Sequence, residues 1–299
     1  MKILVTGSHG FVGSALFPVL RAAEHRLARL VRGAACGANE IGWDPPRNRI
    51  DTAALEGFDA VVHLAGENIA GRWTAARKAR IRESRVAGTR LLCEALTKLK
   101  RPPRTLITAS AIGFYGNRGD ELLAEESAMG NGFLPEVTRD WEAAAQPACM
   151  ANIRVVHLRF GMILGAHGGA LAKMLWPFRL GFGGRIGSGR QRCSWISIDD
   201  VVGVIQFALV NETLSGPVNA VAPASVTNRE FTHVLARVLC RPAFITRLAL
   251  GQMADEVLLS STRVDPARLR AAGYEFKQPQ LEGALHYLLS AGKAHGAMA

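Results

Sequence analysis

Residues 2–13 read Lys2-Ile3-Leu4-Val5-Thr6-Gly7-Ser8-His9-Gly10-Phe11-Val12-Gly13. The apolar run before Gly7 predicts a buried strand, and a helical pattern over residues 12–23 follows the turn. A strand, a glycine-rich turn and a helix in this order are the context in which a dinucleotide binds. Gly7 would permit the tight turn, Gly10 would let a pyrophosphate approach the backbone at the positive end of the helix, and Gly13 would bring the helix close to the sheet.

The alternation of strand and helix continues over the first 160 residues. Further strand patterns lie at residues 26–31, 60–64, 105–110 and 154–159, and helical patterns lie at 73–99 and 140–145. These strands are nearly continuous apolar runs, which is typical of a parallel sheet covered by helices on both faces. We therefore predict an α/β fold with a Rossmann-like doubly wound parallel sheet.

The second half of the chain has a different character. Residues 180–189 contain too many glycines for regular structure, whereas Thr227-Asn228-Arg229-Glu230 is a capping box that predicts a helix to about Leu239. We predict a smaller, mainly helical C-terminal substrate cap on the first domain. The cofactor domain would be residues 1–165, with a return around 195–222, and the cap would be residues 166–194 and 223–299.

Arg32 decides which dinucleotide we expect. It directly follows the predicted strand 26–31, where proteins that prefer NAD carry an Asp or Glu about 20 residues past the glycines to hold the ribose hydroxyls. A carboxylate there would repel a 2′-phosphate, whereas a guanidinium binds it through charge-assisted hydrogen bonds. The sequence therefore predicts NADP(H) as the cofactor.

A second turn of small residues follows the buried strand pattern 60–64. It reads His63-Leu64-Ala65-Gly66 and would lie at the carboxyl end of the strand, beside the crevice of a doubly wound sheet. We expect the adenosine half of the cofactor to lie against the backbone of Leu64, Ala65 and Gly66. A simple tight turn is the alternative interpretation of the same residues.

Further motifs follow one another along the chain. They include Thr108-Ala109-Ser110, Leu158-Arg159-Phe160-Gly161, Trp195-Ile196-Ser197-Ile198-Asp199-Asp200-Val201, Gly66-Glu67-Asn68-Ile69-Ala70, Trp141-Glu142 and Gly187-Ser188-Gly189-Arg190-Gln191. With these motifs the whole chain resembles an extended short-chain dehydrogenase/reductase. It resembles more closely the uncharacterised "epimerase family" group, whose members are described by analogy as nucleoside-diphosphate-sugar epimerases. The C-terminal segment 263–288 resembles the terminal domain of that group. The resemblance implies cofactor contacts at Gly7, Gly10, Phe11, Gly13, Arg32, Leu64, Ala65, Arg85 and Gly161.

The catalytic pair of that superfamily does not occur in this chain. Its members use Tyr-x-x-x-Lys, in which the lysine lowers the pKa of the tyrosine so that it can act as a base. No tyrosine of this sequence has a lysine four residues later. Counting back from Glu142 places Leu134 at the tyrosine position and Thr138 at the lysine position.

Ser110 and Tyr115 are the catalytic residues that we predict instead. Ser110 stands at the superfamily's Ser/Thr position, and Tyr115 follows in a loop flanked by glycines, where it could serve as an alternative acid. Packing, with the hydroxyl in water, is the alternative role for Tyr115. Glu67 and Glu136 are further candidate acids or bases.

Arginines in the glycine-rich stretch suggest the substrate side. Arg185 and Arg190 are the residues that we expect to bind a substrate, because flexible backbone and guanidinium groups suit a diphosphate. A solvent-exposed loop is the alternative. Asp199 and Asp200 fit the acidic first turn of a helix, and no metal-ligand spacing occurs, so we predict no metal.

The net charge of +11 and the isoelectric point of about 10.0 first raise the question of nucleic acid. Arginines are spread along the chain without a basic tail, which favours small phosphate-bearing ligands instead. Five single cysteines without a C-x-x-C motif suit a reducing, cytoplasmic setting. No stretch approaches about 20 apolar residues, so we expect no membrane-spanning helix.

Two functions remain open from the sequence. One is an NADP-dependent oxidoreductase or epimerase that acts on a nucleotide-linked sugar or another small carbonyl compound. The other is a non-catalytic protein that binds NADP(H) and responds to it, having lost turnover with the Tyr-Lys pair. Superfamily analogy adds a homodimer as a candidate assembly.

Overall fold

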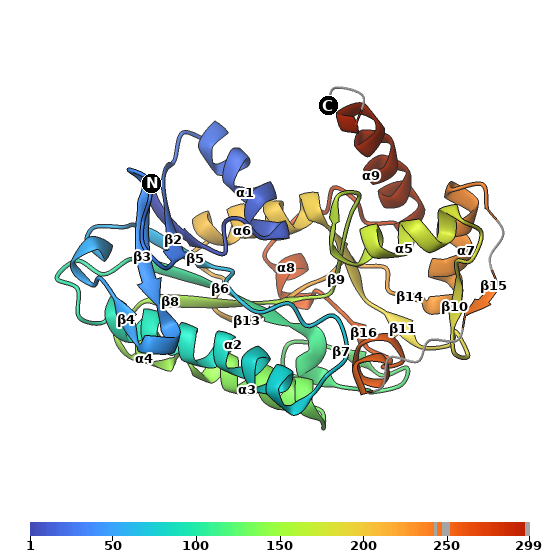
Figure 1. Ribbon diagram of the computed structural model, residues 1–299, viewed down its shortest axis with the longest axis horizontal. Coiled ribbons are helices and arrows are strands. Elements are labelled where there is room, and N and C mark those ends of the chain that lie inside the picture. The colour runs from blue at the N-terminus through green and yellow to red at the C-terminus, as the bar shows by residue number, and fades with distance from the viewer. Residues whose placement is uncertain (242–243, 247–251, 297–299) are drawn as a thin grey trace. The chain divides into compact units, whose positions relative to one another are not determined.

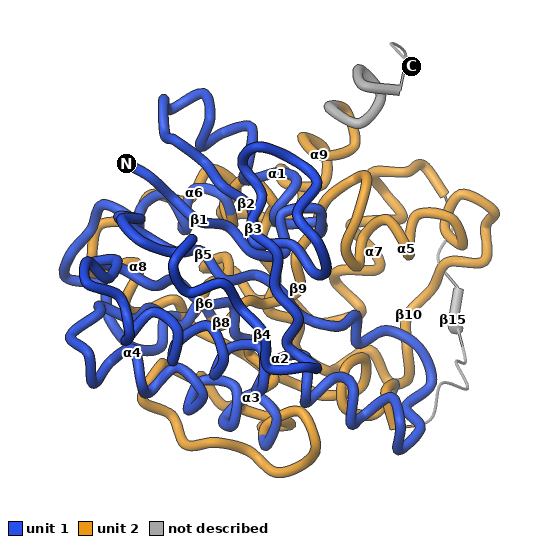
Figure 2. Tube along the Cα trace, turned by 60° about the vertical axis from the view of Figure 1, so that its left-hand side comes forward, with its two compact units in different colours: residues 1–111, 136–158, 202–218 blue, residues 112–135, 159–201, 219–299 orange. Residues whose placement is uncertain are grey.

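The computed structural model describes residues 1–241, 244–246 and 252–296 (Figure 1). The chain forms two compact units, which Figure 2 colours separately. Unit 1 comprises residues 1–111, 136–158 and 202–218, and unit 2 comprises residues 112–135, 159–201 and 219–299. The boundaries of the two units differ from those of the predicted cofactor domain and substrate cap. The assignment of cofactor binding to one domain and substrate binding to the other stays a prediction.

Unit 1 is built on an eight-stranded sheet with the order β13-β8-β6-β5-β1-β2-β3-β4. Its strands are β1 Lys2–Thr6, β2 Arg26–Arg32, β3 Glu40–Asp44, β4 Arg49–Ile50, β5 Ala60–His63, β6 Thr105–Ala111, β8 Arg154–Phe160 and β13 Gly216–Ala220. β1 pairs in parallel with both β2 and β5, so the chain winds outward in both directions from the centre of the sheet. This arrangement confirms the predicted Rossmann-like doubly wound sheet.

Helices cover both faces of this sheet (Figure 1). α1 Phe11–Ala22 and α6 Ile198–Val210 lie on one face, and α2 Ala75–Leu96, α3 Phe133–Ala143 and α4 Gln146–Met150 lie on the other. The core on the α2 side contains Leu4, Val61, Leu92 and Leu106, all fully buried. Burial of such apolar strands on both faces explains why their sequences show no alternation of polar and apolar residues.

The strands β3 and β4 were not among the predicted elements. β3 contains Gly42, where a Cβ atom would lie 2.5 Å from the carbonyl oxygen of Gly33. Only a glycine therefore lets the segment after β2 pass this closely. β3 is short and has a glycine at its centre, so its sequence shows no clear alternation or run of apolar residues. For this reason the sequence did not predict it.

Unit 2 combines helices with short two-stranded pairings. Its helices are α5 Gly169–Arg179, α7 Asn228–Val238, α8 Ala267–Ala271 and α9 Leu281–Gly296. Its strands are β7 Leu122–Leu123, β9 Met162–Gly165, β10 Gly184–Ile186, β11 Arg192–Cys193, β12 Trp195–Ser197, β14 Val226–Thr227, β15 Phe244–Thr246 and β16 Arg263–Val264. They pair as β9 with β12, β10 with β15, β11 with β14, and β7 with β16.

The start of α7 is the predicted capping box. The Thr227 hydroxyl accepts from the Glu230 amide at 3.1 Å, and the Glu230 carboxylate accepts from the Thr227 amide at 2.6 Å. Phe231 and Leu235 of α7 share a core with Leu285 of α9. The glycine-rich stretch is less irregular than predicted, because residues 184–186 within it form β10.

Candidate functional site

The glycine turn joins β1 to α1 in unit 1, and its glycines are required by close contacts. Gly7 has a φ of +65°, and a Cβ there would lie 2.8 Å from the backbone of Leu64. A Cβ on Gly13 would overlap the carbonyl oxygen of Gly7. Both positions therefore exclude any side chain, as the sequence predicts for a turn that packs α1 against the sheet.

The N-terminus of α1 is open to an anion. Its N-cap is Gly10, which offers no side-chain acceptor, and the first turn, from Phe11 on, contains no acidic residue. Backbone amides at such an end carry a partial positive charge. Ser8 in the same turn is only 5% exposed, and its hydroxyl oxygen has no hydrogen-bond partner in the described structure. These features fit a phosphate group placed against the turn.

Thr6 ties this turn to the segment after β5. Its hydroxyl oxygen accepts from the amides of Leu64 at 3.0 Å and Ala65 at 3.1 Å. With both lone pairs used, the hydroxyl proton must be donated to Nδ1 of His63, 2.8 Å away. The segment that the sequence predicts to lie against adenosine is thus held in place by a side chain that sequence reasoning did not single out.

His63 is the centre of this buried network. Because Nδ1 accepts from Thr6, the neutral ring carries its proton on Nε2 and donates to the Thr89 hydroxyl at 3.0 Å. Trp141 of α3 donates to the same hydroxyl at 2.9 Å. Complete burial lowers the pKa of His63 to about 4, so the ring is neutral in the folded protein.

Arg85 lies on α2 and supports the same segment from the other side. Its guanidinium donates to the carbonyl oxygens of Glu67 at 3.0 Å and Ile81 at 3.2 Å, and lies 5.0 Å from the ring of Trp141. Burial lowers the pKa of Arg85 to about 10. A Cβ on Gly66 would lie 3.4 Å from this guanidinium, which is an ordinary van der Waals contact. The arginine positions the loop, and its predicted contact with a cofactor stays a prediction.

Arg32 is the last residue of β2, at the strand end beside the glycine turn. The register pairs Leu30 with Thr6, so Arg32 lies two residues beyond the paired part of β1. Its side chain is exposed, and it forms no ion pair within the described part of the chain. The predicted role in binding a 2′-phosphate is compatible with this position and remains a prediction.

Ser110 lies near the end of β6 and faces α3. It is 3% exposed, and its hydroxyl donates to the Glu142 carboxylate at 2.6 Å. Leu134 and Thr138, at the positions of the missing pair, lie on the same helix. The partnership with Glu142 was not expected, because 32 residues separate the two side chains in the sequence.

The other two candidate acids in unit 1 take part in ion pairs. Arg82 of α2 contacts Glu136 at 3.1 Å and Asp140 at 3.0 Å, which fastens α2 to α3. Glu67 lies 4.0 Å from the guanidinium of Arg80. Neither contact requires a catalytic role for the carboxylate, since partly exposed ion pairs of this kind are common.

Tyr115 belongs to unit 2 and is fully buried. Its hydroxyl donates to Asn219 at 2.7 Å and accepts from Arg159 at 2.9 Å. The guanidinium of Arg159 lies 3.7 Å above the ring of Phe114. Burial raises the pKa of Tyr115 above its usual value. Tyr115 is therefore packed in the core, but its hydroxyl is not in water as the alternative role supposed, because Asn219 and Arg159 bind it. The catalytic role remains a prediction.

The remaining predicted residues also lie in unit 2. A Cβ on Gly161 would lie 2.7 Å from the Ser194 carbonyl oxygen, so a glycine is needed there for close strand packing. Arg185 on β10 has a buried Nε without a partner in the described structure, whereas Arg190 is exposed. Arg192 pairs with Asp120 at 2.7 Å. The predicted substrate contacts of Arg185 and Arg190 stay predictions.

Two searches of the described residues were negative. No group of three His, Cys, Asp or Glu side chains is placed to hold a metal ion in that part of the chain. Among the same residues, no helix has both the length and the apolar character needed to cross a membrane.

Comparison with known proteins identifies the family. Residues 3–220 match the NAD dependent epimerase/dehydratase family, and residues 241–288 match a domain of unknown function, DUF1731. An epimerase family protein of Mycobacterium bovis is 43% identical over 95% of this chain and 96% of its own length. The epimerase family protein SDR39U1 of Homo sapiens is 36% identical over 97% of this chain and all of its own length.

Two solved structures agree with this assignment. Human SDR39U1 (isoform 2), crystallised with NADPH, has a TM-score of 0.89 at 36% identity over 97% of this chain and 99% of its own. A nucleoside-diphosphate sugar epimerase from Corynebacterium glutamicum has a TM-score of 0.82 at 37% identity, over 97% of this chain and 58% of its own. These matches confirm the resemblance to epimerase-family short-chain dehydrogenases/reductases. The chain belongs to the NAD dependent epimerase/dehydratase family.

Proposed function

We propose that this protein binds NADP(H) and acts as an oxidoreductase or epimerase on a small carbonyl or hydroxyl compound, with nucleotide-linked sugars as the first class to test. The observation that carries the proposal is the glycine turn. Gly7 and Gly13 leave no room for side chains, α1 begins without a capping side chain, and the Ser8 hydroxyl is buried without a partner. A pyrophosphate would supply the missing acceptors.

The choice of NADP(H) over NAD rests on Arg32. The end of β2 presents a guanidinium rather than the carboxylate that would hold a ribose 2′-hydroxyl. Human SDR39U1, which is 36% identical to this chain, was crystallised with NADPH. Both observations support a cofactor that carries a 2′-phosphate.

When bound, the nicotinamide would supply hydride transfer, and the chain would supply binding, orientation and a proton. Thr6 and Arg85 would hold the segment around Ala65 against the adenosine half. The proton must come from a group other than Tyr-x-x-x-Lys, which does not occur in the sequence. We propose the hydroxyls of Ser110 and Tyr115 for this role, and the guanidiniums of Arg185 and Arg190 as ligands of a substrate phosphate.

A non-catalytic NADP(H)-responsive protein is the second candidate. The observation that favours it is the state of the two proposed hydroxyls, since Ser110 is engaged by Glu142 and Tyr115 by Asn219 and Arg159. Each hydroxyl would have to exchange a partner before it could serve a substrate. For either function we propose a cytoplasmic protein whose partner is a small molecule, and a homodimer as the assembly.

The experiment that separates the two candidates measures binding and turnover in parallel. NADPH binding to the purified protein is followed by calorimetry, and NADPH oxidation is followed by absorbance with a panel of carbonyl compounds and nucleotide sugars. Tight binding with turnover of any compound supports the enzyme, and Ser110→Ala and Tyr115→Phe then show whether these hydroxyls take part. Tight binding without turnover favours the second candidate, and no binding of NADPH refutes both.

A further inference from the structure

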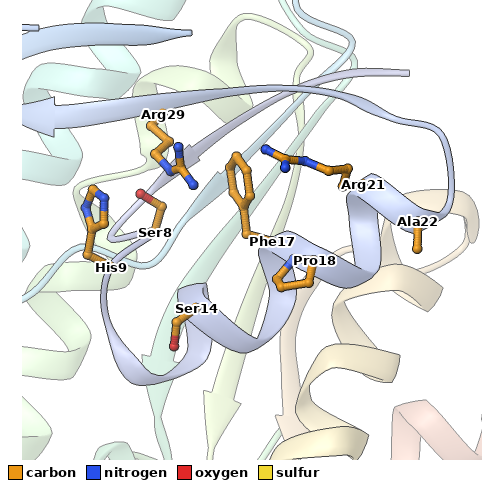
Figure 3. Close-up of a pocket in the computed structure, with 8 residues that line it drawn as sticks. All are labelled: Ser8, His9, Ser14, Phe17, Pro18, Arg21, Ala22 and Arg29. Atoms are coloured by element: carbon orange, nitrogen blue, oxygen red, sulfur yellow. The ribbon is translucent and has the colours of Figure 1, made fainter. Parts of the chain in front are cut away.

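An open groove of about 580 Å³ runs along α1 beside β2 in unit 1 (Figure 3). The residues that line it are Ser8, His9, Ser14, Phe17, Pro18, Arg21, Ala22 and Arg29. Ser8 and His9 belong to the glycine turn, so the groove is continuous with the place proposed for the pyrophosphate. None of these eight lining residues is acidic.

Two guanidinium groups face the Phe17 ring in this groove (Figure 3). That of Arg29 lies 3.9 Å from the ring centroid, and that of Arg21 lies 5.6 Å from it. Neither arginine forms an ion pair with any residue that the structure describes. The contact of Arg29 with the ring holds its charge beside the aromatic surface but neutralises none of it.

Arg29 also has an unused donor. Its Nε is buried and has no hydrogen-bond partner among the described residues, and the same is true of the Ser8 hydroxyl in this groove. Buried polar groups in folded proteins are almost always paired, because an unpaired one loses its hydration without compensation. The unpaired Ser8 hydroxyl and Arg29 Nε, together with the charge of the Arg21 and Arg29 guanidiniums, indicate a ligand that brings several oxygen acceptors and negative charge.

The position of Arg29 on β2 relates this ligand to the dinucleotide. Arg29 is paired in register with Val5 of β1, one residue before Thr6, which leads into the glycine turn. Successive side chains of a strand alternate between faces, so Arg29 and Arg32 lie on opposite faces of β2. A phosphate at the end of this strand could therefore be approached by one arginine from each face.

We infer that the groove along α1 is a phosphate-monoester site that takes the 2′-phosphate of the bound dinucleotide, with Arg29 as a specificity-determining residue beside Arg32. This inference rests on the proposed binding of NADP(H). The guanidinium of Arg29 would supply charge-assisted hydrogen bonds to the 2′-phosphate, while the single proton of the Ser8 hydroxyl serves the neighbouring pyrophosphate. The sequence did not indicate this role, because Arg29 lies inside a strand pattern and not at its end.

The test compares the dissociation constants of NADPH and NADH, measured by calorimetry on the protein without substrate. Arg29→Met keeps an unbranched side chain over Phe17 but removes the charge and the donors, and Arg29→Lys keeps the charge alone. Arg26→Met is the matched control, because Arg26 is an exposed arginine at the start of the same strand. Thermal melts of all variants show that they are folded.

We expect Arg29→Met to weaken NADPH binding by about tenfold or more, corresponding to about 1.4 kcal/mol, with NADH binding changed by less than about twofold. Arg29→Lys should recover part of this loss, and Arg26→Met should leave both constants unchanged. Equal effects of Arg29→Met on the two dinucleotides, or no effect, would overturn the inference. Wild-type protein that binds neither dinucleotide would instead refute the proposed function, on which the inference depends.

Two further probes distinguish the sources of the phosphate. Adenosine 2′,5′-bisphosphate should bind more tightly than 5′-AMP to the wild type and lose this advantage in Arg29→Met. Inorganic phosphate should compete with NADPH. If Arg29→Met abolishes phosphate binding but leaves the preference for NADPH intact, the groove serves a separate phosphate ligand and the assignment to the 2′-phosphate is wrong.

Discussion

Acid should destabilise this protein through the imidazole of His63, which is fully buried. In the folded state its two ring nitrogens are used by the hydroxyls of Thr6 and Thr89, and burial lowers its pKa from 6.5 to about 4. The unfolded chain takes up a proton near pH 6.5, whereas the folded protein resists until about pH 4. The stabilisation is therefore complete above pH 6.5 and is lost as the pH falls through this interval.

The gap between 6.5 and about 4, at about 1.4 kcal/mol for each pH unit, corresponds to about 3 kcal/mol from His63. The assay is urea unfolding of the wild type and of His63→Gln from pH 7 to pH 4. Other groups also titrate in this range, so the quantity of interest is the difference between the two slopes. His286→Gln is the control, because that ring is exposed on α9.

We expect the free energy of unfolding of the wild type to fall by about 3 kcal/mol more than that of His63→Gln over this interval. His286→Gln should follow the wild type. Parallel pH profiles for the wild type and His63→Gln would refute the assignment of a buried, neutral His63. A ring that titrates near pH 6.5 in the folded protein by NMR would refute it directly.

Three other predictions concern the same unit. Thr6→Val leaves the Ala65 amide and Nδ1 of His63 without a partner and should lower the free energy of unfolding by about 2 kcal/mol, as measured by urea unfolding. The exposed Thr97→Val should lower it by less than about 0.5 kcal/mol. Gly13→Ala places a methyl group against the Gly7 carbonyl and should weaken NADPH binding by about tenfold or more in calorimetry; unchanged affinity would show that α1 can shift. Arg32→Met should weaken binding of NADPH by about tenfold while leaving NADH unaffected, and equal losses for both would make Arg32 an ordinary surface residue.

The glycine turn was predictable because all its requirements lie within a dozen consecutive residues. The strand before it, the positive φ of Gly7 and the close packing at Gly13 leave a local pattern of apolar residues and glycines. The parallel strands were predictable for a similar reason, since burial on both faces selects continuous apolar runs. The central strand β5 was expected over residues 60–64 and is observed over Ala60–His63.

The partners of the polar side chains could not be predicted in this way. Ser110 meets Glu142 across 32 residues, and the hydroxyl of Tyr115 meets Asn219 across 104. These contacts depend on which strands become neighbours and which face each side chain takes. The order of residues along the chain specifies neither the neighbouring strands nor the face that each side chain takes.

From its sequence alone, this protein is determined to be a doubly wound α/β protein with a dinucleotide turn at its start, because propensity, burial and glycine requirements act over short stretches. Tertiary structure alone decided that Thr6 and His63 hold the segment after β5, that Arg85 supports that segment from α2, and that Arg29 faces a groove along α1. The physical reason is that a hydrogen bond requires two groups to lie about 3 Å apart with the right orientation, and only the folded chain brings them there.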